Sequence, residues 1–550
     1  MKTLKLKTVV MNAKKLMPMA LLLCFSFVIW SCQKDDALNP LNVIKADGSE
    51  TDEEEVYDGL TVLGAQEANP YSTQNMRYAY NVLVSEGDIQ PGIVPMDATH
   101  LYIRTRPTSE EELNSILSCN DLDLFDYPLD YEIVSQGTYY HDPTIPDSEY
   151  TYIYTVIPMG YPFPATYEVL DSCIIPLDVN EAHYDILSMI EEKSCELFQS
   201  DNMDENRAGR QRRASHSPSG TISVYNTETN SIEGIRGIKV TMRNGVKVSS
   251  RFTDDYGNYA SETEFKCKNV RYTLHFQNTN GVHIYGNLAT LLPAYYGKGR
   301  CSSDGLTFAL YRNSVAWKWA TTNNAEKFYF TTICPNYNIA QPASDLKIWV
   351  APCLNYFSNA SGSAPMLHKM RSDLILSDSI KNFFYVFRKF AANLLPDILI
   401  LLDEQNTTLQ FKKVLWHELA HASHYQNVGS TYWNNFVGGI IWNQIHLGDC
   451  YGTGTHYRDG YIGVGEMWAY FIECKAYNQY TNGFMTIADY WFKPAIMKDL
   501  NTNMLYTSHI FACLTPNEHS HYSLKSKLQQ TYPIYYWTPL KIDKKLAIKQ

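Results

Sequence analysis

The chain has 550 residues, which is too long for one hydrophobic core, so several domains are expected. Hydrophobic residues make up 45% of it and charged residues 19%, a globular balance that excludes wholesale disorder. The formal net charge of −12 at pH 7 repels nucleic-acid phosphates, so nucleic acids are excluded as partners.

The first 31 residues have the pattern of a secretory signal. Five Lys precede an apolar run over residues 17–30, which Ser31 and Cys32 follow. The run is shorter than the roughly 20 apolar residues that a bilayer-spanning helix needs. Ile29, Ser31 and Cys32 resemble a bacterial lipoprotein box, which implies that Cys32 is lipidated. We therefore expect a lipoprotein signal peptide at 1–31.

An acidic segment follows over residues 32–59. Such a charge run cannot bury a core, so it predicts a solvated tether. Its start, Gln33-Lys34-Asp35-Asp36, resembles the Lys-acid-acid export signal of Gram-negative surface lipoproteins. The resemblance implies a cell-envelope protein on the outer membrane, facing the cell surface, which contacts the membrane only through its lipid.

Residues 60–200 mix helix and strand signals and predict an α+β module of unknown function. The expected elements are helices at Met76–Leu83 and Ser109–Leu117 and strands at Leu101–Arg104, Tyr152–Val156 and Tyr167–Leu170. Residues 124–131 and 139–143 resemble a module of uncharacterised bacterial lipoproteins, which implies no activity.

A polar, Arg-rich segment at 201–219 predicts a linker. Apolar and polar residues then alternate with a period of two. This pattern predicts a small antiparallel β-sandwich at 220–290, with Gly257 in a turn between strands. This segment resembles the transthyretin-like regulatory domain first described in carboxypeptidases. Such a domain implies a bracing or display role and no catalysis.

Residues 300–550 predict a mainly helical domain, so the expected fold class is multidomain α+β. A buried helix is expected at Ser379–Leu394 and a buried strand at Ile398–Leu402. Thr407 and Gln410 form a capping box, which predicts a helix that runs to Val428 and ends at Gly429.

The sequence His417-Glu418-Leu419-Ala420-His421 lies inside that last helix. Residues four apart share a helix face, so both imidazoles reach one ion. Glu418 lies roughly 100° round the helix, where it can accept a proton from an attacking water. This is the HExxH motif of zincin metallopeptidases, which implies one catalytic Zn²⁺.

A catalytic zinc site needs a third protein ligand. His424 lies on the face of His417 but another turn along, and Asn427 stands where the metzincin pattern requires His, which excludes that family. Glu466, followed by Ala469 on a predicted helix, resembles the gluzincin signature. The resemblance implies His417, His421 and Glu466 as the zinc ligands.

Other polar residues near the motif have less certain roles. Glu473, seven residues after Glu466, is a candidate acceptor for an imidazole N–H. Gluzincins often use a Tyr or His to donate a hydrogen bond to the oxyanion, and the sequence does not decide among His456, Tyr457 and Tyr461. It likewise assigns no disulfide among its 12 Cys and no oligomeric state.

The sequence supports two functional hypotheses. The first is a zinc-dependent endopeptidase with protein or peptide substrates, anchored to the cell envelope. The alternative is a catalytically inactive lipoprotein that keeps the zincin fold for binding or structure. The intact Glu418 favours the enzyme, because an inactive descendant has no physical need of a general base.

Overall fold

The computed structural model describes residues 60–533, apart from gaps at 147–148, 179–180, 200–216, 268, 287–289, 353–361, 366–396, 403–405 and 504. The expected signal peptide, Cys32 and the acidic tether lie outside the described residues, as does the helix expected at 379–394. The chain divides into two compact units, with the boundary between Asn323 and Asn324. We call them the N-terminal and the C-terminal unit.

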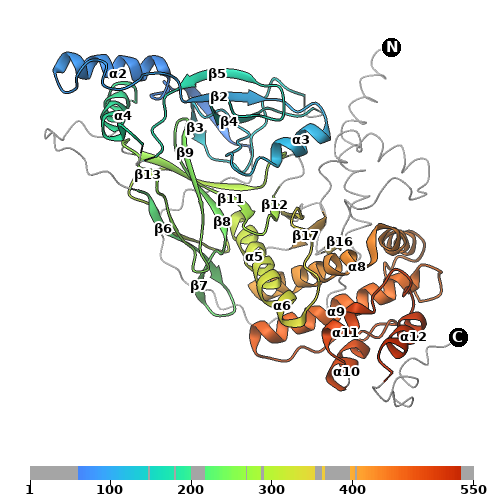
Figure 1. Ribbon diagram of the computed structural model, residues 1–550. Coiled ribbons are helices and arrows are strands. Elements are labelled where there is room, and N and C mark those ends of the chain that lie inside the picture. Colours follow the sequence, from blue (N-terminus) through green and yellow to red (C-terminus); the bar gives the residue numbers. More distant parts are fainter. Residues whose placement is uncertain are drawn as a thin grey trace, which may run out of the picture. The chain divides into compact units, whose positions relative to one another are not determined.

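The first part of the N-terminal unit is a mixture of helices and strands (Figure 1). Its elements are β1 (Val62–Gln66), α2 (Thr73–Glu86), β2 (His100–Thr105), α3 (Glu110–Leu117), β3 (Tyr131–Ser135), β4 (Ile153–Pro158), β5 (Glu168–Cys173) and α4 (Tyr184–Phe198). β2 pairs antiparallel with both β4 and β5, and β1 pairs with β3. Ser72 and Ser109 cap α2 and α3 by accepting a hydrogen bond from the backbone N–H three residues on. All five elements expected here are confirmed.

The second part of this unit consists of strands. They are β6 (Ser219–Asn226), β7 (Ser231–Gly234), β8 (Ile238–Asn244), β9 (Lys247–Phe252), β10 (Asn258–Ala260), β11 (Asn269–Asn278), β12 (His283–Tyr285), β13 (Tyr295–Ser302) and β14 (Phe308–Leu310). One sheet has the order β12-β11-β8-β9, with β13 also paired to β11; the other has the order β10-β6-β14, with β7 paired to β6. Gly257 takes φ +84° in the turn before β10, as expected.

Three details differ from the sequence expectation. β6 begins at Ser219, within the segment expected to be a linker. β13 and β14 follow residue 290, where the sandwich was expected to end, because pairing partners distant in sequence leave no local signal. β14 pairs with β6 in parallel, so the strands are not all antiparallel.

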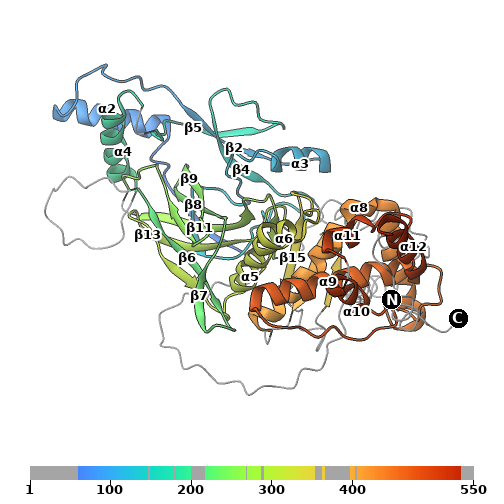
Figure 2. The same ribbon diagram turned by 60° about the horizontal axis from the view of Figure 1, so that its bottom comes forward.

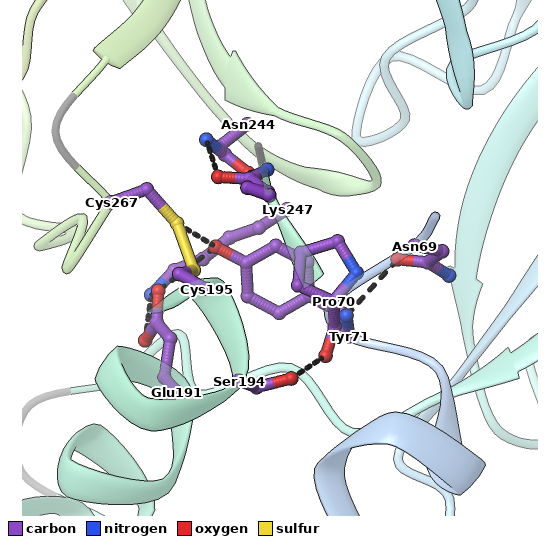
Figure 3. Close-up of a disulfide and its surroundings, with 10 residues drawn as sticks. Asn69, Pro70, Tyr71, Glu191, Ser194, Cys195, Asn244, Lys247 and Cys267 are labelled. Carbon is purple, nitrogen blue, oxygen red and sulfur yellow. Dashed lines mark hydrogen bonds and ion pairs between the residues drawn. A yellow bond between two sulfur atoms is a disulfide. The ribbon is translucent and has the colours of Figure 1, made fainter. Parts of the chain in front are cut away.

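A buried polar cluster joins α4 to the strands (Figure 3). Cys195 of α4 forms a disulfide with Cys267, which precedes β11. Beside it, Lys247 of β9 donates hydrogen bonds to both carboxylate oxygens of Glu191, at 2.9 and 2.8 Å, and both side chains are fully buried. The Tyr71 hydroxyl donates to the same carboxylate at 2.9 Å. The two parts of the N-terminal unit are therefore held together covalently and by charge.

The C-terminal unit is mainly helical, as expected. It contains the end of α5 (Val315–Phe328), the π-helix η1 (Tyr329–Ile333), α6 (Cys334–Tyr337), β15 (Lys347–Pro352), β16 (Gly362–Pro365), β17 (Ile398–Leu402), α8 (Thr408–Leu447), α9 (Asp459–Thr481), α10 (Ala495–Asn503), α11 (Thr507–Ala512) and α12 (His521–Thr531). β17, the strand that the sequence predicts, lies between β15 in parallel and β16 antiparallel. α8 and α9 lie side by side (Figures 1 and 2).

Gly429 interrupts α8 without ending it. Its φ of 69° and ψ of −176° are not helical, and a second helical stretch continues directly to Leu447. The sequence correctly predicts the break, because glycine adopts positive φ at little cost. The prediction that the helix stops there is wrong, since the residues after Gly429 return to helical geometry at once.

Candidate metal centre

The first half of α8 carries the HExxH residues. Its start is fixed by the predicted capping box, in which Thr407 and Gln410 satisfy each other's backbone N–H groups. The apolar neighbours of the motif, Leu415, Trp416 and Leu419, are fully buried. Burial of these side chains fixes the rotation of α8 about its axis and therefore the direction of the histidines.

α9 brings Glu466 to the motif. The indole N–H of Trp468 donates to the backbone carbonyl of Ala420 at 3.0 Å, which ties α9 to α8 between the two histidines. A Cβ at Gly465 would clash with the ring of Phe436, so this glycine allows the two helices to approach closely. Gly465 is therefore a position where only glycine fits.

His417, His421 and Glu466 converge on one point. Nε2 of His417 lies 3.3 Å from Oε2 of Glu466, and Nε2 of His421 lies 3.4 Å from Oε1. One ligand atom from each of the three residues lies within 4.8 Å of the others. All three side chains are fully buried. The sequence therefore named a set of residues that the fold brings together.

The separations between these atoms suit a zinc ion. Zinc bonds to nitrogen and oxygen of about 2.0–2.1 Å, arranged tetrahedrally, place neighbouring ligand atoms about 3.3–3.4 Å apart. The nitrogens that face the point, Nε2 of His417 and of His421, are buried and form no hydrogen bond with the residues that the structure describes. Buried polar atoms without a partner indicate a missing ion or water. The donor set thus fits a divalent metal of the zinc type.

Glu473 holds the other face of His417. Its Oε2 accepts a hydrogen bond from Nδ1 of His417 at 3.2 Å, and its Oε1 lies 3.6 Å from the ammonium of Lys413. The contact expected from the sequence is confirmed. A proton fixed on Nδ1 leaves the lone pair of Nε2 directed at the converging point.

The carboxylates make the centre favourable for positive charge. Burial opposes protonation of His417, but its contacts with Glu466 and Glu473 outweigh burial and raise its pKa to about 10. Burial likewise opposes ionisation of Glu466, but the adjacent His421 and His417 lower its pKa to about 2. The carboxylates therefore stabilise a cation at the centre, whether that cation is a proton or a metal ion. Glu418 is fully buried beside His417, and its charge also raises that pKa.

Aromatic rings surround the histidines. The ring of Tyr470 lies 4.6 Å from that of His417, and its hydroxyl is hydrogen-bonded to those of Tyr451 and Tyr490, at 3.0 and 3.1 Å. Sequence reasoning missed this contact, although Tyr470 is one helical turn after Glu466. Phe436 lies 5.2 Å from His421, ring to ring.

His424 does not join the ligand set. It is fully buried, and its ring lies 5.1 Å from that of Tyr432. Burial, followed by the nearby His421, lowers its pKa to about 3, so it remains neutral. Among the described residues, the group that could hold a metal consists of His417, His421 and Glu466, and His424 is not part of it.

The three candidates for an oxyanion donor make contacts elsewhere. His456 stacks on Trp442 at 4.0 Å between ring centroids, and Tyr457 is 70% exposed. Tyr461 stacks on His519 at 4.6 Å. None of these contacts brings the side chain to the metal ligands, so the expectation that one of them serves this centre is not supported. The choice among the three as an oxyanion donor therefore stays a prediction.

No protein-family model, curated protein or solved structure matches this chain. In the part of the chain that the structure describes, no helix is long and apolar enough to cross a membrane.

Proposed function

We propose that this protein is a zinc-dependent endopeptidase of gluzincin type. The observation that carries the proposal is the convergence of His417, His421 and Glu466 at separations of 3.3–3.4 Å, with Glu418 buried beside them. When bound, zinc lowers the pKa of a coordinated water to about 7 and polarises the scissile carbonyl.

The protein's own residues have distinct tasks in this proposal. His417, His421 and Glu466 hold the ion, and Glu473 keeps His417 in the tautomer that binds metal. Glu418 accepts the proton of the attacking water, which is the work of a general base. The substrate is a protein or peptide, as the resemblance to gluzincins implies.

We also propose that the enzyme is a lipoprotein of the cell envelope, attached through Cys32 to the outer membrane of a Gram-negative bacterium and facing the cell surface. The disulfide between Cys195 and Cys267 supports export, because such bonds persist in oxidising compartments. In this view the strands β6 to β14 form a transthyretin-like domain that displays the zincin-like C-terminal unit.

One observation favours the alternative of an inactive zincin-fold lipoprotein. All four side chains of the centre, Glu418 included, have no exposed surface, whereas a peptidase must admit a peptide bond to its metal. In that case the metal would be structural, and the protein would act by binding.

A cleavage profile separates the two functions. We expect the zinc-loaded protein to cleave members of an unbiased peptide library, and Glu418→Gln to cleave them about 10²–10⁴-fold more slowly while it retains zinc. Asp489→Asn, a change to an exposed acid of the same unit, is the matched control and should leave cleavage unchanged. Absence of cleavage by zinc-loaded wild type would favour the binding protein.

A further inference from the structure

Three arginines lie on neighbouring strands of the sheet around β11. Arg271 of β11 is directly opposite Arg243 of β8 and also directly opposite Arg300 of β13. Directly opposite residues of antiparallel strands place their side chains on the same face, with Cβ atoms about 4.5–5.5 Å apart. The three guanidinium groups therefore form a row on one face of the sheet, which we call the arginine row. Like charges in this arrangement destabilise a sheet.

Arg243, at the inner end of the row, is incompletely satisfied. It is 3% exposed. Its Nη1 donates to the backbone carbonyl of Leu129 at 3.2 Å, and the guanidinium carbon lies 5.4 Å from the ring centroid of Tyr127. Nε and Nη2 are buried, with no hydrogen-bond partner among the described residues. Because arginine does not shed its proton in proteins, these donors indicate an acceptor that the protein itself does not supply.

The charges of the row are not balanced. Arg300 forms an ion pair with Glu67. In the described part of the chain, neither Arg243 nor Arg271 forms one, so the row and Glu67 together carry a net charge of about +2. Burial, together with the like charges of Arg243 and Arg300, lowers the pKa of Arg271 to about 10, which leaves it charged at neutral pH.

The row leads from the surface into the unit. The side chain of Arg300 is 44% exposed, Arg271 is half-buried, and Arg243 is buried. The row therefore presents one guanidinium to solvent at Arg300 and has the unsatisfied donors of Arg243 at its buried end.

We propose that the arginine row binds a small tetrahedral oxyanion with a charge near −2, of the phosphate or sulfate type. Guanidinium groups bind such anions through paired N–H···O hydrogen bonds. An anion of this charge neutralises the row, whereas a monocarboxylate leaves one positive charge uncompensated. The site lies in the N-terminal unit, so it is independent of the metal centre and of the proposed peptidase activity.

Isothermal titration calorimetry of the full chain tests the proposal. Inorganic phosphate and sulfate are titrated at low millimolar concentration and constant ionic strength, with acetate as the carboxylate probe. We expect saturable binding of one phosphate or sulfate per chain and much weaker binding of acetate. No saturable binding of phosphate or sulfate overturns the proposal, and so does acetate binding of equal strength.

Variants then locate the site. Arg271→Gln and Arg300→Gln should each weaken anion binding about 10- to 100-fold, which is the usual effect of losing a charged hydrogen bond. Arg300 is partly exposed, so its variant should retain the fold, and hydrogen exchange of β11 and β13 verifies this. Arg251→Gln removes the same charge from a surface pair with Glu262 and should bind as wild type does. Unchanged binding in Arg271→Gln and Arg300→Gln would overturn the assignment.

Discussion

The ion pair between Lys247 and Glu191 should be a major determinant of the stability of the N-terminal unit. Both side chains are fully buried, and the ammonium donates to both carboxylate oxygens. Replacing Lys247 by Met leaves the carboxylate of Glu191 buried without its counter-charge. Breaking a buried pair in this way typically costs about 3–5 kcal/mol of unfolding free energy.

A double variant separates the loss of the pair from the loss of packing. Lys247→Met with Glu191→Gln removes both charges, and the Gln side chain still accepts the hydrogen bond from Tyr71. Replacing both members of a buried ion pair by uncharged residues often changes stability little. The double variant should therefore recover at least about 2 kcal/mol of unfolding free energy relative to Lys247→Met alone. Lys193→Met, which breaks a partly exposed pair with Glu86, should cost no more than about 1 kcal/mol.

Hydrogen-exchange mass spectrometry along a urea series provides the assay, because it follows peptides of α4 and β9 separately from the C-terminal unit. Equal losses in Lys247→Met and Lys193→Met would refute the reasoning. A double variant as unstable as the sum of its single variants would refute it as well.

Three further predictions concern other parts of the chain. Glu418→Gln should keep zinc and lose cleavage, whereas Glu466→Gln should lose zinc more readily and regain activity with added metal. Elemental analysis and cleavage assays with and without added zinc distinguish the two variants. The reverse pattern would exchange the roles of the two residues. Burial raises the pKa of Asp126 to about 7, so the folded protein favours the protonated carboxyl group. The contribution of Asp126 to the free energy of unfolding is therefore present at low pH and is lost as the pH rises through 7. Asp126→Asn should therefore stabilise the N-terminal unit against urea at pH 8 and change it little at pH 4; an equal effect at both pH values would contradict the cause. Mass spectrometry of the native N-terminus should find a lipid-modified Cys32, and an intact signal or an unmodified Cys32 would disprove the lipoprotein assignment.

Local signals in the sequence predicted much of the fold. Ser72, Ser109 and Thr407 begin helices because each side chain binds a nearby backbone N–H, an interaction that depends on residues three positions apart. The metal ligands on α8 were predictable for the same reason, since His417 and His421 share a helix face. Gly429 shows the limit of a local signal: glycine marks the break, but it does not determine whether the helix resumes.

Features that depend on distant pairing were not predictable. The parallel pairing of β14 with β6 joins segments more than 80 residues apart. The row formed by Arg243, Arg271 and Arg300 likewise exists only through the register of three strands. The contact of Tyr470 with His417 depends on how α9 packs against α8, which tertiary packing decides.

The zinc content of the purified chain decides whether His417, His421 and Glu466 form a metal centre. Elemental analysis after exhaustive dialysis should find about one zinc per chain in wild type, and His421→Ala should lose it, because one of three ligands is removed from the converging point. His446→Ala, which changes an exposed histidine of the same helix, should keep the metal. Zinc retained by His421→Ala at the wild-type level, or absent from zinc-supplemented wild type, would contradict the assignment of the metal centre.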